Sequence, residues 1–195
     1  MKISFIILLI FPSICFAQQK KHWSDNYWLS TNLSLLYSIE NLGNAAALDI
    51  GRSFKHGFKI GAGYNFVQFD ADTKVDVVNA YFEKSIDTKT KSLFFFAKPG
   101  IAIPKKAKIL SNKISPYEYV AKKNGFNFQV GSGIRWKIKR HSFFLNAGYN
   151  ITNFSFVTRE FITPVNPYNP FVEEPIMHNY RLNYKKIFVS IGFTL

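Results

Sequence analysis

Cysteine is nearly missing from this chain of 195 residues, which contains only Cys15. We expect Cys15 to be removed with an N-terminal signal, because the bulky Ile14 before it disfavours the alternative of a lipoprotein acceptor. The mature chain then has no thiol. Its composition excludes a disulfide framework, a thiolate metal site and a cysteine nucleophile.

Long apolar runs are scarce as well. The run at 3–11 is too short for a membrane helix, which needs about 20 residues. It follows the positive Lys2, and the small residues Cys15 and Ala17 occupy the −3 and −1 positions of a cleavage site. These features predict a signal peptide at 1–17, a short periplasmic segment at 18–26 and one folded domain at 27–195.

Acidic residues are few: 12 Asp and Glu stand against 25 Lys and Arg, a formal charge of +13 that falls to +12 when Lys2 is removed. Nucleic acid is not an expected partner, because the chain is exported and carries no basic helix or RNA-binding signature. A membrane surface that bears phosphates is the more natural anionic partner.

Alternation of apolar and polar residues is abundant. Between Gly125 and Lys139 the even positions carry residues such as Phe128 and Ile134, and the odd positions carry residues such as Gly131 and Arg135. A period of two indicates a strand whose two faces meet different environments. Eight such strands are expected, at 28–39, 45–54, 58–66, 77–86, 93–103, 125–139, 143–152 and 187–195. Pro99 marks a bulge or an edge in the fifth.

The connections between these strands are asymmetric. Those at 55–57, 87–92 and 140–141 are short, whereas those at 105–124 and 162–180 are long. Every long connection falls at the same end of the strands, as in outer-membrane barrels with short periplasmic turns and longer outer loops.

The polar face carries mostly glycine, asparagine and serine, which suit the narrow interior of an eight-stranded barrel. The apolar face then points outward, and the 21 Phe and 10 Tyr suffice for aromatic girdles at both membrane interfaces. We predict an all-β fold: a single eight-stranded antiparallel up-and-down transmembrane β-barrel. A soluble periplasmic lipocalin-like barrel is the alternative.

The chain resembles the small OmpA/OmpX-like outer-membrane β-barrel proteins, and most of all those of the Bacteroidota, including the PorT-like group. The resemblance rests on the signal ending Phe16-Ala17, the strand motif GAGYN at 61–65, and the last strand at 186–195. It implies the fold and the outer membrane of a Gram-negative bacterium. It also implies contact with the barrel-assembly machinery through the terminal Phe193 and Leu195, although Ser190 and Leu195 depart from the family's glycine and terminal aromatic.

The sequence carries no recognisable catalytic or metal-binding pattern. The four histidines have no ligand spacing. His141-Ser142 lacks an orienting third residue, and its two side chains point to opposite faces of a strand. Asp70, Asp72 and Asp76 lack the glycine and terminal glutamate of a calcium loop. We expect no catalytic residue, no metal site and no cofactor.

Two sets of charged residues are candidate sites. Strand parity directs one set into the lumen, where an ion network is predicted from Asp49, Lys59, Glu83, Lys98, Arg135, Lys137 and Lys186. The other set surrounds the third outer loop and is predicted to contact phosphates of surface glycolipid: Lys105, Lys106, Lys108, Lys113, Lys122 and Lys123.

The expected function is non-enzymatic. The chain is predicted to act as a structural or surface-interaction protein through the outer loops at 105–124 and 162–180, with outer-membrane lipid and lipopolysaccharide as partners and a protein partner at these loops. Two alternatives from other classes remain: a narrow ion or small-solute channel, and a lipid-modifying enzyme of the outer membrane.

Overall fold

The computed structural model describes residues 27–39, 42–71, 73–88, 90–106, 117–138, 141–161 and 175–195. The predicted signal peptide at 1–17 and the segment at 18–26 lie outside the described residues. Among the residues described, no helix is long and apolar enough to cross a bilayer.

Almost every described residue belongs to a strand, as the alternating sequence predicts. The strands are β1 (Tyr27–Tyr37), β2 (Leu42–Phe54), β3 (Phe58–Gln68), β4 (Lys74–Asp87), β5 (Lys91–Lys106), β6 (Tyr117–Lys123), β7 (Gly125–Ile138), β8 (His141–Phe161) and β9 (Pro175–Thr194), with a 3-10 turn η1 (Lys55–Gly57).

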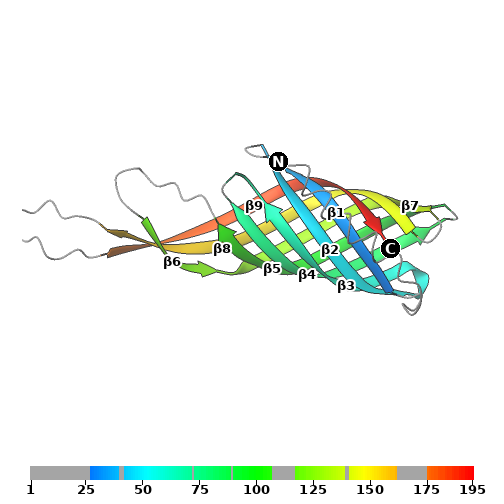
Figure 1. Cartoon of the computed structure of the whole chain (residues 1–195), viewed down its shortest axis with the longest axis horizontal. Helices are drawn as coiled ribbons and strands as arrows, with labels where there is room; N and C mark the ends of the chain where they lie inside the picture. The colour runs from blue at the N-terminus through cyan, green and yellow to red at the C-terminus, as the bar shows by residue number, and fades with distance from the viewer. Residues whose placement is uncertain are drawn as a thin grey trace, which may run out of the picture.

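The strands close into an antiparallel barrel (Figure 1). Consecutive barrel strands pair with one another, and β9 closes the barrel by pairing with both β1 and β8. Eight strands form the wall, because β6 and β7 are two parts of one strand. β7 pairs with β8 as far as Asn127↔Thr152, and β6 continues along β8 from Lys123↔Ser155. The predicted eight-stranded antiparallel barrel is confirmed.

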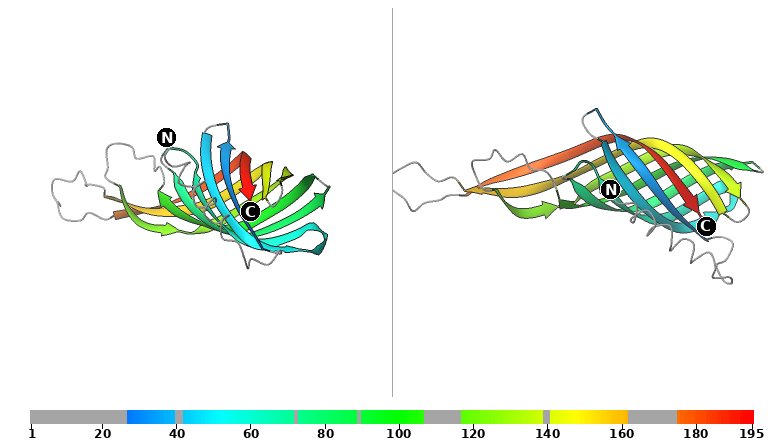
Figure 2. Two further views of the ribbon diagram at one scale, coloured as in Figure 1. Left: turned by 45° about the vertical axis from the view of Figure 1, so that its right-hand side comes forward. Right: turned by 45° about the horizontal axis from the view of Figure 1, so that its top comes forward.

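Most wall strands are longer than predicted, β8 and β9 most of all, and this corrects both long loops. β6 occupies 117–123 of the loop expected at 105–124, and β9 begins at Pro175 inside the loop expected at 162–180. The 21 residues of β8 and the 20 residues of β9 exceed the roughly 9–11 residues that cross a bilayer. The ends of β8 and β9 therefore project beyond the barrel together with β6, in all views (Figures 1 and 2). We call β6 with residues 153–161 and 175–186 the projecting sheet.

Pro99 lies inside β5, between two neighbouring strands. The β4–β5 partners run from Asn79↔Gly100 directly to Phe82↔Ala97, so the ladder is interrupted beside Pro99 while the register is kept. The shift of register lies elsewhere, between Lys74 and Val75. The irregularity expected at Pro99 is therefore a gap in the ladder between β4 and β5. Such a gap is consistent with proline, which has no backbone N–H to donate.

The two ends of the barrel differ. The chain enters β1 and leaves β9 at the end that carries the turns after β2, β4 and β7, which we call the tight-turn end; the opposite end is the long-loop end. At the first tight turn Gly57 has φ 73, and a Cβ there would lie 2.4 Å from the carbonyl oxygen of Ser85. Glycine is therefore required at this turn.

Large apolar side chains point outward on every wall strand. Their exposed fractions lie between 45% and 61% for Leu35, Ile50, Ile60, Phe82, Phe95, Ile134, Leu145 and Val189, one from each strand. Outward aromatic residues gather toward both ends of this surface. They are Tyr27, Phe54, Phe58, Trp136, Phe143 and Phe193 at the tight-turn end, and Tyr37, Tyr64, Phe66, Phe126, Phe128 and Tyr149 at the long-loop end. The barrel is therefore apolar outside, as predicted.

Glycines and aromatic rings fill the lumen in pairs. A Cβ on Gly192 would lie 2.2 Å from the ring of Phe144, its direct cross-strand partner. Four further glycines stand in the same relation to a ring on the facing strand: Gly51 to Trp28, Gly131 to Phe96, Gly133 to Phe94 and Gly148 to Phe188. The glycines of the inward face thus make room for rings that close the interior.

Candidate functional site

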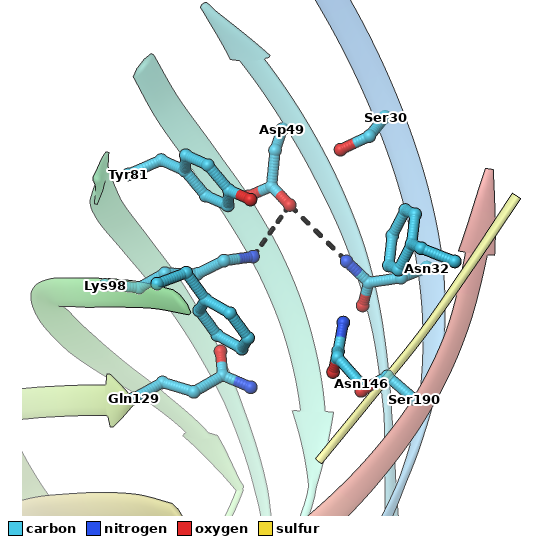
Figure 3. A pocket seen from close by; sticks show the side chains of 10 residues that line it. Ser30, Asn32, Asp49, Tyr81, Lys98, Gln129, Asn146 and Ser190 are labelled. Atoms are coloured by element: carbon cyan, nitrogen blue, oxygen red, sulfur yellow. Dashed lines mark hydrogen bonds and ion pairs between the residues drawn. The ribbon is translucent and has the colours of Figure 1, made fainter. Parts of the chain in front are cut away.

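The middle of the lumen is a polar cluster to which seven of the eight wall strands contribute. Asp49 of β2 accepts hydrogen bonds from Lys98 of β5 at 2.7 Å and from Asn32 of β1 at 3.4 Å. Figure 3 shows these groups facing one another across the interior. The other side chains around them are Ser30, Tyr81, Phe96, Gln129, Phe144, Asn146 and Ser190. They leave a cavity of about 10 Å³, the space of one water molecule.

The geometry of Asp49 depends on a glycine. Gly63 faces Asp49 across the β2–β3 ladder, and a Cβ on Gly63 would lie 2.1 Å from Asp49 Oδ1. The same Cβ would lie 2.6 Å from Asn79 Oδ1 on the other neighbouring strand. No larger residue fits at position 63 while Asp49 keeps its place.

A second ion cluster lies nearer the tight-turn end. The two terminal guanidinium nitrogens of Arg135, Nη1 and Nη2, donate to the carboxylate of Glu83, each at 2.7 Å, and Lys59 Nζ lies 3.6 Å from Glu83 Oε1. The Glu83 side chain is completely buried and that of Arg135 is 6% exposed. Two parallel charge-assisted bonds of this kind fix both geometry and charge state. Arg135 also lies over the ring of Phe94, with 4.5 Å to the centroid.

Tyr81 joins the two clusters. Its hydroxyl donates to Glu83 Oε2, and Lys98 Nζ lies 4.9 Å from the centre of its ring. The ring also packs against Trp28 at 4.8 Å. The sequence reasoning missed this role, although strand parity places Tyr81 on the same face as Glu83.

The predicted lumen set divides among four places. Asp49 and Lys98 form one pair, and Glu83 gathers Lys59 and Arg135. Lys137 faces Asp87 at 3.4 Å at the tight-turn end, where both side chains are substantially exposed. Lys186 lies near the long-loop end and donates to the carbonyl oxygen of Phe69 at 2.9 Å. Tyr81 links the first two of these groups, whereas Lys137 and Lys186 lie apart from them.

The turn between β3 and β4 caps the long-loop end of the lumen. Phe69 and Thr73 are fully buried, and the Phe69 ring stacks on Tyr184 of β9 at 4.3 Å. The Tyr184 hydroxyl is hydrogen-bonded to Thr73 Oγ1 at 3.0 Å and to Asp70 Oδ2 at 3.3 Å. Phe69, Asp70 and Thr73 thus all contact Tyr184 of β9 at this end of the lumen.

Three of the six predicted glycolipid-contact lysines have a described side chain. Lys105 pairs with Asp76 at 3.0 Å, and Lys122 donates to the carbonyl oxygen of Lys105 at 2.7 Å. Lys123 is exposed on β6. Lys108 and Lys113 lie outside the described residues, and only the backbone of Lys106 is described.

The chain terminus completes the wall. Phe193 pairs with Thr31 and Phe143, and the backbone nitrogen of Leu195 donates to the carbonyl oxygen of Leu29 at 2.9 Å. In the described part of the chain, no three His, Cys, Asp or Glu side chains come together in a way that would hold a metal ion.

Comparison with known proteins gives a class for this fold. No family profile matches the chain, and no curated protein matches its sequence. Among solved structures, Neisserial surface protein A is 14% identical with a TM-score of 0.53, over 88% of this chain and 97% of that one. The N-terminal β-barrel domain of Pseudomonas aeruginosa OprF is 9% identical with a TM-score of 0.46, over 88% and 98%. The likeness to the neisserial protein shows that the chain has the fold of the small eight-stranded outer-membrane β-barrels.

Proposed function

We propose that this protein is a non-enzymatic barrel of the Gram-negative outer membrane. Its role is structural or one of surface interaction, and it displays the projecting sheet and the connections at 105–124 and 162–180 outside the cell. The supporting observation is an apolar outer surface between two groups of aromatic residues, wrapped around a lumen that side chains fill.

The dimensions of the outer surface suit a bilayer. On β9 the outward residues are apolar from Ile187 to Leu195, about 27 Å along a strand. At the tilt of about 35–45° usual for outer-membrane strands this covers roughly 20 Å, close to the ~25 Å apolar band of such barrels. A soluble lipocalin-like barrel would bury these side chains in its core and expose polar ones.

The lumen argues against the channel alternative. Ion pairs, aromatic rings and the buried residues Phe69 and Thr73 occupy the interior, and the cavity at its centre is about 10 Å³. The same crowding argues against an enzyme inside the barrel, because Glu83 and Asp49 are already engaged by Arg135 and Lys98. A buried acid in a strong ion pair is poorly suited to proton transfer.

We also propose relatives and binding partners for this protein. We place the chain among the OmpA/OmpX-like barrels of the Bacteroidota, including the PorT-like group, on the motifs described above. Lipid and lipopolysaccharide of the outer membrane are proposed partners. The assembly machinery would recognise the end of β9 at Phe193 and Leu195, and a protein partner would bind the projecting sheet.

Fractionation tests this proposal. The protein should appear in the outer-membrane fraction and should migrate differently on denaturing gels before and after boiling, because small barrels resist unfolding by detergent until heated. Recovery in the soluble periplasmic fraction, or migration that boiling leaves unchanged, would contradict the proposal.

A further inference from the structure

The outward face of the projecting sheet changes character at one level. On β8 the outward residues are apolar up to Ile151, and the next ones are Asn153 and Ser155. On β9 the apolar residues end at Ile187, and the next outward residue is Lys185. Ile151 and Lys185 are direct cross-strand partners, so both strands turn polar at the same height.

Basic residues gather just above this boundary. Lys123 of β6 and Arg181 of β9 are the two cross-strand partners of Ser155, one on each side. Directly opposed residues share a face of the sheet, and neighbouring strands lie about 4.8 Å apart, so these two cations are separated by roughly 10 Å. Lys185 lies on the same face, four residues from Arg181 and about 13 Å closer to the apolar surface.

None of the acidic side chains that the structure describes pairs with these three cations. Each of the three is exposed. The described side chains of β8 and β9, at 141–159 and 177–195, include no aspartate or glutamate. In contrast, Lys105 is neutralised by Asp76, and Lys122 is engaged with the carbonyl oxygen of Lys105.

We infer that Lys123, Arg181 and Lys185 form a binding site for the phosphate groups of an anionic glycolipid in the outer leaflet. This inference rests on the proposed outer-membrane location and specifies the lipid contact of that function. Cations immediately above an apolar wall meet lipid phosphates while the wall meets the acyl chains. Arg181 supplies a planar fork that binds phosphate in a bidentate manner, and the Ser155 hydroxyl between the cations offers a further donor.

The site differs from the one expected from sequence. Of the six lysines predicted around the third outer loop, only Lys123 belongs to it. Arg181 and Lys185 come from β9, more than 50 residues further along the chain. Pairing through β8 brings these residues together.

A lipid titration tests the inference. Purified protein folded in neutral dodecyl maltoside micelles is titrated with bisphosphorylated lipid A or with the same lipid after dephosphorylation, and bound lipid is counted by native mass spectrometry. The Lys123→Gln/Arg181→Gln variant should bind the bisphosphorylated lipid about thirtyfold more weakly than wild type, since each cation near an anionic membrane surface contributes about 1 kcal/mol. Lys185→Gln should weaken binding by about fivefold.

The matched control is Lys55→Gln/Lys91→Gln, which removes the same charge at exposed positions of the tight-turn end. It should bind as wild type does. Equal affinity of the two double variants, no preference for the phosphorylated lipid, or displacement by an equal concentration of inorganic phosphate would overturn the inference. These results would leave the proposed function standing if the protein still fractionates with the outer membrane. Absence of the wild type from that fraction would overturn both.

Discussion

Arg135 and Glu83 face each other across the lumen through two parallel hydrogen bonds of 2.7 Å, although 52 residues separate them in the chain. Strands β4 and β7 do not pair with one another, because β5 lies between them. The bond pair therefore spans the interior and ties non-adjacent parts of the wall. The Arg135–Glu83 ion pair therefore stabilises the closed barrel and obstructs passage through its lumen.

The first prediction concerns this pair. Glu83→Gln should lower the urea midpoint of unfolding clearly, since removing one partner of a buried ion pair costs about 3–5 kcal/mol. Lys84→Gln should barely change the midpoint, because Lys84 lies outside the barrel with its ammonium 4.1 Å from the centre of the Phe58 ring. Tryptophan fluorescence during urea titration measures both.

A second control tests whether the burial of the Glu83–Arg135 pair causes the loss of stability. Asp87→Asn breaks the exposed pair with Lys137, in which the side chains are 49% and 39% exposed. Its effect should stay below about 1 kcal/mol. Equal effects of Glu83→Gln and Lys84→Gln would contradict the register of β4, and a large effect of Asp87→Asn would contradict the role assigned to burial.

The second prediction concerns the glycine–ring pairs. Gly192→Val should destabilise the barrel by about 1–3 kcal/mol or more, because the new side chain overlaps the Phe144 ring. Adding Phe144→Ala to Gly192→Val should recover part of this loss, although Phe144→Ala alone is destabilising. The control Ala147→Val lies on the exposed outer face and should have little effect. Urea midpoints of the wild type, the two single variants and the double variant form a double-mutant cycle, and Ala147→Val is the control outside it. Strict additivity of Gly192→Val and Phe144→Ala would show that the two residues do not share this space.

The third prediction concerns conductance. Wild-type protein in planar bilayers should give no steady porin-like steps, because eight strands enclose an interior that side chains fill. The two rings beside the central cavity, Phe96 and Phe144, contribute to this closure. Large, stable single-channel steps from purified wild-type protein would favour the channel alternative.

The fourth prediction concerns the cap that Phe69, Asp70 and Thr73 form against Tyr184. Tyr184→Phe removes the hydroxyl that binds Thr73 and Asp70, so hydrogen exchange of the Thr73 amide should accelerate. Tyr180→Phe, on the same face of β9 but further from the barrel, is the control and should leave that amide unchanged. Mass spectrometry of exchanged peptides covering 66–75 measures the difference. Equal exchange in both variants would mean that backbone contacts alone hold the turn.

The sequence by itself determined the face of each strand, because a side-chain period of two depends only on backbone geometry. The inward positions of Asp49, Glu83 and the lumen phenylalanines follow from that parity, as does the outward position of Lys84. The number of wall strands and the tight turns also follow from alternation and turn residues. Glycine at position 57 is an example, since its positive φ is a local property.

Only the tertiary structure decided which residues meet. Strand parity directs Arg135 and Glu83 inward. Their heights along the barrel axis depend on the stagger between neighbouring strands of the closed barrel, and no local sequence pattern encodes that stagger. The same holds for Phe144 over Gly192 and for Tyr81 between two ion clusters. The length of β8 and β9 did not follow from the sequence either, because in their outer ends the apolar side chains, such as Phe154, Phe156 and Leu182, lie on the inward face and the outward residues are mostly polar. Lys123 and Arg181 therefore became neighbours of Ser155 only through strand pairing, which couples residues without regard to their separation in the chain.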